Sequence, residues 1–474
     1  MVQDNTLDSK SQNIDEYYNK CKEGINSLDI AQKYKDAALK NIKVWLSEDE
    51  FSEYVPQLKY LIDSGKFDFL LDSFYQIIPF GTGGRRGLVG IGTNRINKWT
   101  IQASAQGHSQ YLVKQHGDKA KEKGVVLTYD VREFTDKGVY DDSIYNPVMN
   151  LSCKDLAEAA AQVYTANKIK VFMFDDFRST PQLSFSIRYL DAISGDMFSA
   201  SHNPPSDNGK KVYDEFGGQL VPPYDEALVK EVTQNVDDIK TIDLDEARKK
   251  GLVIDCDEKV DKAYFDAVKN LSMSESRSIK IVYSPLHGTG LRSFYPILKD
   301  MGFDISLEPK TKNISGKFEN VVFNIPNPEV EQSFETLKVY GDEVNADILI
   351  SSDPDADRIG VMVKHIGNWE YLNGNEIGIL LSEYGIDKFK KNKKDSGNVI
   401  VKTIVTTSMI QKICEENGVE CIGDLLVGFK YIGEKMNELE KQGRIDNFIL
   451  GTEESHGFLM GNYARDKDGA AGAV

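Results

Sequence analysis

Short apolar runs alternate with amphipathic stretches of helix length over most of the chain. From Gly124 onwards, each run consists of β-branched or aromatic residues and is bounded by glycine, proline or charged residues. The runs occupy residues 125–129, 170–174, 279–283, 348–350 and 399–401. Repetition of strand, loop and helix predicts an α/β chain with largely parallel or mixed sheets. Ligands bind such sheets at the loops that follow the carboxyl ends of the strands, so functional residues are expected there.

The first fifty residues follow another pattern. They are highly polar, and their apolar residues recur at roughly helical spacing between Ile14 and Leu28. We expect one or two helices that pack on a larger body, and we assign residues 1–45 to this N-terminal helical extension. Polar, charged stretches near 235–250 and after the run at 359–363 are candidate boundaries between the domains that follow.

Composition narrows the class of protein. A chain of 474 residues suggests about three domains, and a hydrophobic fraction of 40% excludes wholesale disorder and fibrous architectures. A formal net charge of −17 repels nucleic acid, which is therefore not an expected partner. Five scattered cysteines without CxxC spacing indicate a reducing compartment and argue against disulfides or zinc. Without a signal peptide or an apolar run of membrane-spanning length, we expect a cytoplasmic protein that makes no membrane contact.

Four loops carry residues suited to chemistry, and the first, at 80–87, combines glycines with Arg85 and Arg86. Glycines let backbone amides approach an anion closely, and neighbouring arginines can grip a phosphate. The loop lacks the Gly-Lys-Ser/Thr of a Walker loop and is no dinucleotide fingerprint. Taken alone, it is equally well explained as a glycine turn with solvated arginines.

The second loop, at 199–205, reads Ser-Ala-Ser-His-Asn-Pro-Pro and is followed by Lys210 and Lys211. A serine and a histidine that are adjacent in the chain cannot form a catalytic triad, because their side chains point apart. The serine hydroxyl can instead carry a phosphoryl group, whose charge the lysines offset. By composition alone, a polar turn ended by two prolines is the better explanation.

The third loop, at 351–358, directly follows the apolar run at 348–350. Asp353, Asp355 and Asp357 occupy alternate positions, so their carboxylates converge on one side of an extended loop and form an oxygen cage for Mg²⁺. An EF-hand is excluded, because arginine and lysine stand where its glycine and final glutamate would be. An exposed acidic turn is the alternative, but three spaced aspartates closed by an arginine favour a metal site.

The fourth loop, at 451–457, follows the apolar run at 448–450 and contains Glu453, Glu454 and Ser455. Two carboxylates and a hydroxyl suit the hydroxyl groups of a sugar, although glutamates at a strand end are more often merely solvated. One chemistry would use all four loops, namely phosphoryl transfer on a sugar phosphate. In that reaction a metal neutralises charge at the transferring group, and positioning supplies most of the rate.

The sequences of these loops resemble the α-D-phosphohexomutase family. Residues 199–204 are similar to the family's Thr-Ala-Ser-His-Asn-Pro, whose serine is phosphorylated in the active enzyme. Residues 353–358 resemble its Asp-Gly-Asp-x-Asp-Arg metal loop, residues 451–457 its sugar loop, and Arg86 the arginine of its Phe-Gly-Thr-x-Gly-x-Arg-Gly. Further similar segments lie at 129–132, 208–213, 284–290 and 428–430, so the resemblance extends from about Phe80 to Asp468. Within the family, the sequence is most similar to phosphoglucomutases of the larger bacterial type and to phosphopentomutases.

The resemblance implies roles for individual residues. Ser201 would carry the phosphoryl group, and one Mg²⁺ per active site would be held by Ser201, Asp353, Asp355 and Asp357. Glucose 1,6-bisphosphate would act as an activator. The catalytic candidates are Ser201, Arg86, His202, Lys211, His287 and Lys430. Of these, Lys211, His287 and Lys430 are candidates for acid–base or charge-stabilising roles. The candidate substrate-binding residues are Glu453, Ser455, Arg358 and Gly428.

The resemblance also implies three consecutive α/β domains with mixed sheets. They are a phosphoserine domain at 46–240, a metal-binding domain at 241–366 and a sugar-binding domain at 367–474. The family's fourth domain, whose Arg-x-Ser-x-Thr loop clamps the other phosphate, is expected to be absent, since the sequence ends a few residues into a helix of the third domain. The chain as written is therefore expected to turn over poorly.

Three residues depart from the family's pattern. Ser199 replaces threonine, Pro354 replaces glycine and Val427 replaces threonine. The proline fixes φ near −65°, so the metal loop must tolerate that geometry.

The activity that the resemblance implies is interconversion of glucose 1-phosphate and glucose 6-phosphate. Phosphorylated Ser201 would donate to the free hydroxyl, and the resulting bisphosphate would reorient before it returned its other phosphate. A phosphopentomutase or phosphomannomutase is the alternative within the enzyme class. A truncated sugar-phosphate-binding protein with little turnover is the alternative outside it. In each case the expected partner is a small-molecule sugar phosphate.

Overall fold

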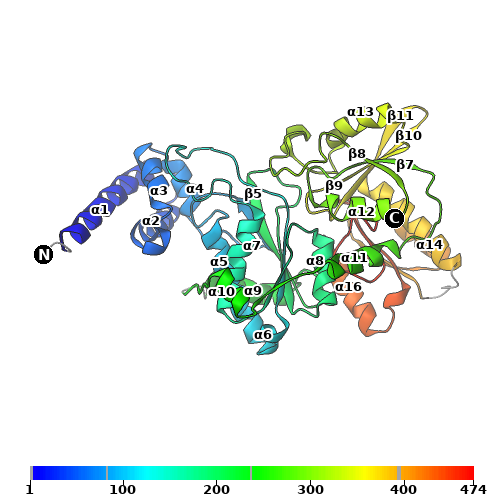
Figure 1. Ribbon diagram of the computed structural model, residues 1–474, viewed down its shortest axis with the longest axis horizontal. Helices are drawn as coiled ribbons and strands as arrows, with labels where there is room; N and C mark the ends of the chain where they lie inside the picture. Colours follow the sequence, from blue (N-terminus) through cyan, green and yellow to red (C-terminus); the bar gives the residue numbers. More distant parts are fainter. Residues whose placement is uncertain (1–3, 82–83, 235–237, 392–396) are drawn as a thin grey trace.

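The computed structural model describes residues 4–81, 84–234, 238–391 and 397–474. Along this described chain, a helical N-terminal part is followed by three β-sheets with helices packed against them (Figure 1). This arrangement confirms the predicted α/β class with mixed sheets. Within the described residues, no helix is both long and apolar enough to cross a membrane.

The N-terminal part is built of helices, and α1 extends from it away from the rest of the molecule (Figure 1). Its elements are α1 (Asp4–Ser27), α2 (Gln32–Ser47), η1 (Asp49–Phe51), α3 (Val55–Asp63) and α4 (Phe67–Phe74). The ring of Trp45 stacks on Phe51 at 4.5 Å and lies 5.7 Å from Trp99, which joins these helices to the first sheet's domain. The helical part continues beyond residue 45, because buried apolar residues of α3 and α4, such as Leu58 and Leu70, share this core.

The first sheet has the strand order β1-β5-β4-β2-β3-β6. Its strands are β1 (Gly84–Leu88), β2 (Val125–Tyr129), β3 (Val171–Met173), β4 (Ser194–Phe198), β5 (Asp207–Tyr213) and β6 (Val253–Asp255). β2, β3, β4 and β6 run parallel, whereas β5 and β1 add antiparallel at one edge. β6, which lies beyond residue 240, hydrogen-bonds to β3 and covers what would otherwise be an open edge.

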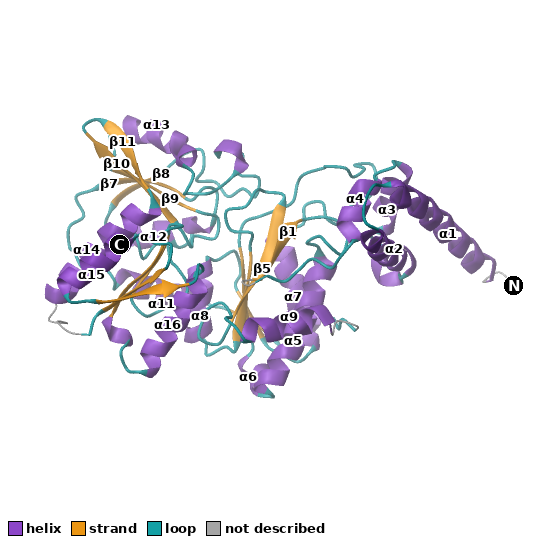
Figure 2. Ribbon diagram, turned by 180° about the vertical axis from the view of Figure 1, so that it is seen from behind, coloured by secondary structure: helices purple, strands orange, loops and turns teal. Residues whose placement is uncertain are grey.

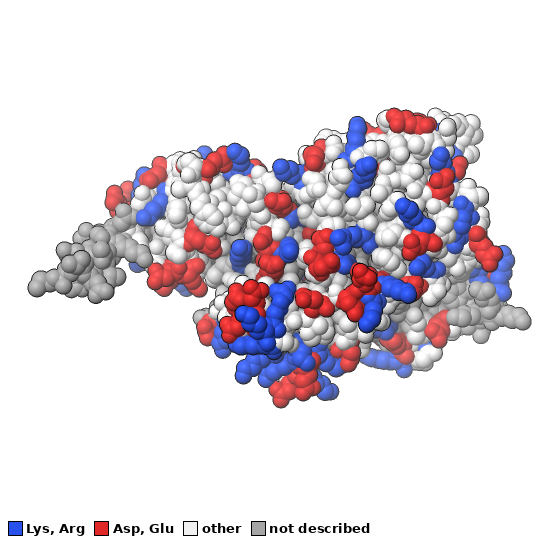
Figure 3. All heavy atoms as spheres, in the orientation of Figure 1, with Lys and Arg blue, Asp and Glu red and all other residues white. Residues whose placement is uncertain are grey.

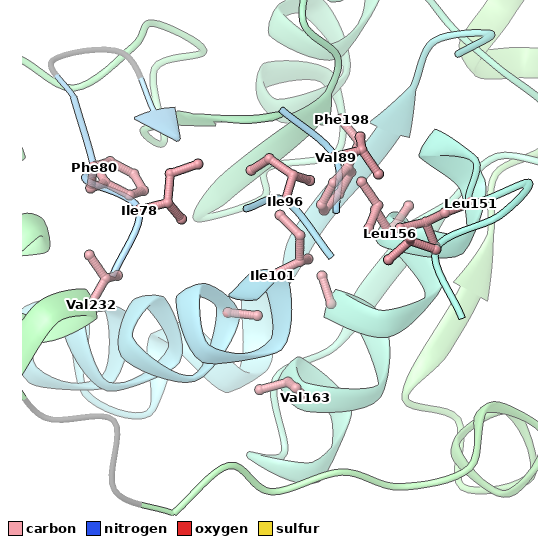
Figure 4. Close-up of a cluster of buried hydrophobic side chains, with 14 of the residues drawn as sticks. Ile78, Phe80, Val89, Ile96, Ile101, Leu151, Leu156, Val163, Phe198 and Val232 are labelled. Carbon is pink, nitrogen blue, oxygen red and sulfur yellow. The ribbon is translucent and has the colours of Figure 1, made fainter. Parts of the chain in front are cut away.

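Helices cover both faces of this sheet. They are α5 (Lys98–His116), α6 (Lys119–Lys123), α7 (Cys153–Ala166), α8 (Thr180–Tyr189), α9 (Tyr224–Gln234) and α10 (Leu244–Lys249). Figures 1 and 2 show α5, α7 and α9 on one side and α8 on the other. Apolar side chains from the segment around α5 and from α7 meet beneath the strand that ends at Phe198, as Figure 4 shows. Burial of this apolar surface stabilises the layer that carries the loop after β4.

The second sheet has the order β11-β10-β9-β7-β8. Its strands are β7 (Lys280–Ser284), β8 (Asp304–Leu307), β9 (Ile348–Ser352), β10 (Ile359–His365) and β11 (Asn368–Leu372). The accompanying helices are α11 (Glu258–Lys269), η2 (Thr289–Leu291), α12 (Phe294–Asp300), η3 (Val322–Asn324), η4 (Glu331–Phe334) and α13 (Glu335–Glu343). β8, β7 and β9 are parallel, and the loop at the carboxyl end of β9 carries the three aspartates.

The third sheet has the order β13-β12-β14-β15. Its strands are β12 (Val399–Thr403), β13 (Glu420–Leu425), β14 (Phe448–Glu453) and β15 (Gly457–Met460). The helices are α14 (Gly374–Lys391), α15 (Ser408–Asn417), α16 (Phe429–Lys441) and η5 (Ile445–Asn447). The glutamate loop joins β14 to β15. Every apolar run named in the sequence has formed a strand, and the candidate loops at 199–205, 351–358 and 451–457 lie at strand ends. Residues 84–87 of the first candidate loop belong to β1 itself.

Charged side chains lie over the whole surface that Figure 3 presents. Acidic and basic side chains are interspersed there, and a group of lysines surrounds α6, which itself holds Lys119, Lys121 and Lys123. On this face the acidic side chains are not gathered in one patch.

Candidate active site

Ser201 lies on the loop that follows β4, in a left-handed backbone conformation that residues other than glycine rarely adopt. Its φ is +54°, and the residue is buried. Its N–H donates to Ser199 Oγ at 2.7 Å, and Ser199 Oγ donates to Asp130 Oδ2 at 2.6 Å. The guanidinium of Arg132, paired with Asp130, donates to the carbonyl oxygen of Ser201. These buried polar contacts hold the loop in a conformation that would otherwise be unfavourable.

The hydroxyl of Ser201 is directed at the second sheet's aspartate loop. Its Oγ donates to Asp353 Oδ2 at 2.9 Å. The serine and the aspartate belong to different sheets and are far apart in sequence, so this contact exists only because the two domains pack together. It joins the predicted phosphoryl carrier to the predicted metal site.

The three aspartates form one buried cluster. Oxygen atoms of Asp353, Asp355 and Asp357 lie within 4.8 Å of one another. Lys211 Nζ is 2.5 Å from Asp355 Oδ2 and 3.0 Å from Asp357 Oδ2, and Lys467 Nζ is 3.2 Å from Asp357 Oδ2. Arg358 Nε is 3.9 Å from Asp357 Oδ1, so three cationic side chains lie close to the three carboxylates.

The donor set of this cluster fits a divalent metal ion. Among the residues that the structure describes, the buried atoms Asp355 Oδ1 and Asp357 Oδ1 have no hydrogen-bond partner. A buried carboxylate oxygen without a partner is costly, and a hard cation coordinated by oxygen atoms would satisfy it. The loop accommodates Pro354, whose carbonyl accepts a hydrogen bond from the Thr289 N–H at 2.7 Å.

Electrostatics within the cluster separate the three carboxyl groups. Burial, together with the charges of Asp357 and Asp355, raises the pKa of Asp353 well above its usual range. Burial acts on Asp357 as well, but Lys211 and Lys467 outweigh it and hold the pKa of Asp357 below its usual range. A bound cation would remove the cost of keeping Asp353 ionised beside its neighbours.

The glutamate loop lies next to the aspartate loop. Arg358 and Gly457 form a bridge between the two loops, and the Arg358 N–H donates to Asp353 Oδ1 at 3.1 Å. Glu453 Oε1 accepts a hydrogen bond from the Gly428 N–H at 3.1 Å. Glu453 is buried and Ser455 is half-buried.

His202 and Arg86, two further catalytic candidates, have different surroundings. His202 Nδ1 is 3.3 Å from Ser201 Oγ, and burial with the nearby charges of Arg358 and Arg86 lowers the pKa of His202 to about 3. His202 is therefore neutral at neutral pH. Arg86 is exposed on β1, opposite Gly209 of β5. Thr82 and Gly83 of the predicted phosphate-gripping loop lie outside the described residues.

The structure does not bring every predicted catalytic residue to the aspartates. Lys430 is buried at the start of α16, where its Nζ is 3.0 Å from Asp225 Oδ2 of α9. His287 is buried on the loop before η2, with Nδ1 2.6 Å from the carbonyl oxygen of Asn313. The contact of Lys430 links α16 to α9. His287 Nε2 is buried without a hydrogen-bond partner among the described residues, and the N–H of nearby Thr289 donates to the aspartate loop. The acid–base roles of these two residues stay predictions.

Lys467 and Thr180 are functional candidates that the sequence analysis missed. Lys467 follows β15 in the run Arg-Asp-Lys-Asp at 465–468, and the burial of all four charged residues is the unusual feature. Thr180 begins α8, and its Oγ1 donates to Asp355 Oδ2 at 2.6 Å. The run of alternating charges at 465–468 is a sequence signal that could have indicated Lys467. No feature of the neighbouring sequence distinguishes Thr180.

The segment that carries Lys467 follows β15 of the third sheet and is anchored to the domains of the other two sheets. The Tyr213 hydroxyl of β5 donates to Asp466 Oδ2 at 2.7 Å, and the Tyr264 hydroxyl of α11 donates to Asp468 Oδ2 at 2.8 Å. The N–H of Gly469 donates to the carbonyl oxygen of Ala356 in the aspartate loop at 3.2 Å. Lys467 is thus held against Asp357 by contacts on both sides of it.

Models of known protein families match most of this architecture. The model described as phosphoglucomutase/phosphomannomutase, alpha/beta/alpha domain I matches residues 149–238, domain II matches residues 262–367 and domain III matches residues 373–474. These matches cover more than half of the chain. The chain belongs to the phosphoglucomutase/phosphomannomutase family. Membership confirms the predicted relation to the α-D-phosphohexomutases, the three consecutive α/β domains and the enzyme class, a mutase that transfers phosphoryl groups.

Individual relatives of this family agree. A protein of Staphylococcus haemolyticus named phosphoglucomutase is 31% identical over 414 residues, which are 86% of this chain and 69% of that protein. A protein of Homo sapiens named phosphopentomutase is 30% identical over 449 residues, which are 91% of this chain and 69% of that protein. A crystal structure of a family member from Burkholderia thailandensis has the same fold, with a TM-score of 0.63, 17% identity and coverage of 84% of this chain and 75% of that one.

Proposed function

We propose that this mutase interconverts glucose 1-phosphate and glucose 6-phosphate through a phosphoserine at Ser201 and a bisphosphate intermediate. The observation that carries the proposal is the 2.9 Å contact between Ser201 Oγ and Asp353 Oδ2, which unites a hydroxyl with a buried oxygen cluster. A nucleophilic oxygen beside carboxylates that fit a divalent cation is what phosphoryl transfer requires. The similarity to a protein named phosphoglucomutase supports glucose as the sugar.

The proposed transfer balances over two steps. The free hydroxyl of the sugar phosphate attacks phosphorus, the bond from phosphorus to Ser201 Oγ breaks, and the hydroxyl proton is passed on so that Oγ leaves as a hydroxyl. The bisphosphate then turns round, and Ser201 Oγ attacks its other phosphoryl group in the reverse of the first step. Asp353, Asp355, Asp357 and the Ser201 oxygen would hold Mg²⁺, which when bound offsets charge on the transferring group.

The lysines of the site are assigned charge stabilisation. Burial opposes protonation of Lys211, but Asp355 and Asp357 outweigh it and raise the pKa of this lysine. A lysine that stays protonated cannot accept the sugar's proton, whereas it can stabilise the negative charge that develops on the phosphoryl oxygens. Lys467, which shares Asp357 with Lys211, has the same role in this proposal. Arg86 and Arg358 are assigned to phosphate and substrate binding.

A substrate panel tests the proposed activity. Glucose 1-phosphate, mannose 1-phosphate and ribose 1-phosphate are each supplied with Mg²⁺ and with glucose 1,6-bisphosphate, which loads Ser201. The proposal expects the highest kcat/KM with glucose 1-phosphate. A preference for ribose 1-phosphate would make the protein a phosphopentomutase, a second candidate that the similarity to the Homo sapiens protein favours. Turnover of none of the three sugars would contradict both.

The pH dependence of substrate binding provides a separate prediction. Burial raises the pKa of Glu453 to about 7, against the opposing charges of Lys467 and Arg358. Only the ionised carboxylate accepts hydrogen bonds from sugar hydroxyls, so binding is expected to weaken as the pH falls through about 7. KM for glucose 1-phosphate should rise by up to about tenfold per pH unit on the acidic side.

Two variants distinguish this cause from a general acid effect. Glu453→Gln should lower kcat/KM at alkaline pH and should abolish the acidic limb of the KM profile, because glutamine does not ionise. Glu454→Gln, at the neighbouring position in the same loop, should retain that limb. An acidic limb that Glu453→Gln leaves in place would assign the ionisation to another group.

A further inference from the structure

Thr180 connects the phosphoserine-bearing domain to the aspartate loop. It is the first residue of α8, which packs on the first sheet, and it is fully buried. Its N–H donates to the carbonyl oxygen of Asp355 at 2.9 Å, and its Oγ1 donates to Asp355 Oδ2 at 2.6 Å. Asp355 belongs to the loop after β9 of the second sheet, so both bonds cross between domains.

The two oxygen atoms of Asp355 have unequal surroundings. Oδ2 accepts hydrogen bonds from Thr180 Oγ1 and from Lys211 Nζ, at 2.6 and 2.5 Å. Oδ1 is buried and has no partner in the described part of the chain. A carboxylate turned out of this orientation would lose both of these charge-assisted bonds. Thr180 and Lys211 of the first domain therefore bind Oδ2 of Asp355, and Oδ1 can accept a further ligand.

Thr180 is itself held rigidly at the start of its helix. The side chain of Ser179 accepts a hydrogen bond from the N–H of Gln182, and Pro181 stands in the first turn. A serine before the first turn and a proline within it are the residues that best define a helix start. The backbone bond to Asp355 adds a second anchor. The hydroxyl of Thr180 is thus held in a fixed position, from which it can orient the Asp355 carboxylate.

We propose that Thr180 is a positioning residue for the metal site, and this inference rests on the proposed function of the aspartate loop. Its hydroxyl orients the Asp355 carboxylate so that Oδ1 faces the bound cation. The affinity of the second domain's loop for the cation consequently depends on the docking of the first domain. Outer partners that orient a metal ligand change metal affinity by about 10–100-fold when they are removed.

The test removes the hydroxyl and retains the shape of the side chain. Thr180→Val keeps the branched side chain and the backbone N–H, and Thr180→Ala is a second hydroxyl-free variant in case valine packs poorly. Thr180→Ser restores the hydroxyl. Thr165→Val is the matched control, because Thr165 is equally buried but donates to Ala161 within α7. Mn²⁺, a paramagnetic substitute for Mg²⁺, is titrated into each protein without sugar phosphate and followed by electron paramagnetic resonance.

The expected result is a loss of Mn²⁺ affinity of about 10–100-fold in both hydroxyl-free variants. The Mg²⁺ concentration for half-maximal turnover should rise by the same factor, with kcat at saturating Mg²⁺ close to that of the parent protein. Thr180→Ser and Thr165→Val should keep the parent affinity. Melting temperatures measured beside each titration show that the variants are folded.

Two results would overturn the inference. One is unchanged Mn²⁺ affinity in folded Thr180→Val and Thr180→Ala. The other is a fall in kcat at saturating metal without any change in affinity, which is the signature of a role in packing alone. The titration needs no substrate, so it is independent of the proposed activity. A parent protein that turns over no sugar phosphate would refute the proposed function and leave the affinity comparison valid.

Discussion

Replacement of Ser201 by alanine is expected to abolish phosphate incorporation and mutase turnover while the fold is retained. The hydroxyl is the only atom group lost, and it is the proposed acceptor and donor of the phosphoryl group. Both steps of the proposed reaction pass through this hydroxyl, so kcat should fall by at least about 10⁴-fold. The serine's backbone conformation depends on Ser199 and Arg132, which the substitution does not touch.

The cost to stability should be small. Ser201 Oγ contributes one hydrogen bond to Asp353 and one contact to His202. Loss of a bond of this kind changes the free energy of unfolding by about 1–3 kcal/mol. The measurement is intact-protein mass after exposure to glucose 1,6-bisphosphate, together with turnover of glucose 1-phosphate. Ser206→Ala is the matched control, since Ser206 lies on the same loop and its Oγ contacts only Asp207.

Phosphate deposited on Ser201→Ala at the parent level would place the carrier at another residue. Loss of both activities in Ser206→Ala as well would attribute the effect to the loop and not to the hydroxyl.

Replacement of Asp357 by asparagine should have the second largest effect, a fall in kcat/KM of at least about a thousandfold. The substitution removes one of three carboxylates that would hold the cation. A bound metal supplies several kcal/mol of charge stabilisation in phosphoryl transfer, and each 1.36 kcal/mol is tenfold in rate. It also removes the charge that Lys211 and Lys467 share, which leaves Lys211 paired with Asp355 at 2.5 Å and Lys467 3.9 Å from Asp466 Oδ1.

Stability is governed by two opposing changes in this variant. Removal of one partner from a buried ion pair costs about 3–5 kcal/mol, whereas loss of one charge relieves the repulsion among Asp353, Asp355 and Asp357. The net change in melting temperature should therefore be smaller than the loss of activity. Mn²⁺ titration measures the loss of metal affinity, and kcat/KM at saturating Mg²⁺ measures the loss of activity. Asp342→Asn is the control, because Asp342 is exposed and pairs with Lys364 at the surface.

Parent-level turnover of Asp357→Asn in excess chelator would refute the metal assignment. A thousandfold loss in Asp342→Asn as well would show that the domain responds to any lost aspartate.

Local pattern was sufficient for the strands and for the candidate loops. The runs at 125–129, 348–350 and 399–401 are apolar because these strands are buried on both faces of their sheets, which leaves a mark on each sequence segment separately. The aspartate loop was equally readable, since alternation of three carboxylates after a strand is a local feature. Resemblance to the family added Ser201, which composition alone would have treated as part of a polar turn.

Domain boundaries were the least readable part of the fold. The stretch near 235–250 is polar enough to suggest a boundary, yet α10 lies within it, and β6, which follows it, pairs with β3 of the first sheet. The N-terminal helices likewise continue to Phe74. Whether a short segment ends one domain or begins the next depends on which edge it covers, and that is a property of the assembled sheet.

The sequence by itself determined the fold class, the strands and the loops that bear chemistry, because hydrophobic period and residue type act over a few neighbouring positions. Only the tertiary structure decided which of these residues meet. Ser201 reaches Asp353, Thr180 reaches Asp355, and Lys467 reaches Asp357, each from a part of the chain remote from the aspartate loop. Lys430 instead forms an ion pair with Asp225. Such pairings are decided by the burial of charge, since a buried ionic group must find its partner wherever domain packing brings one within reach.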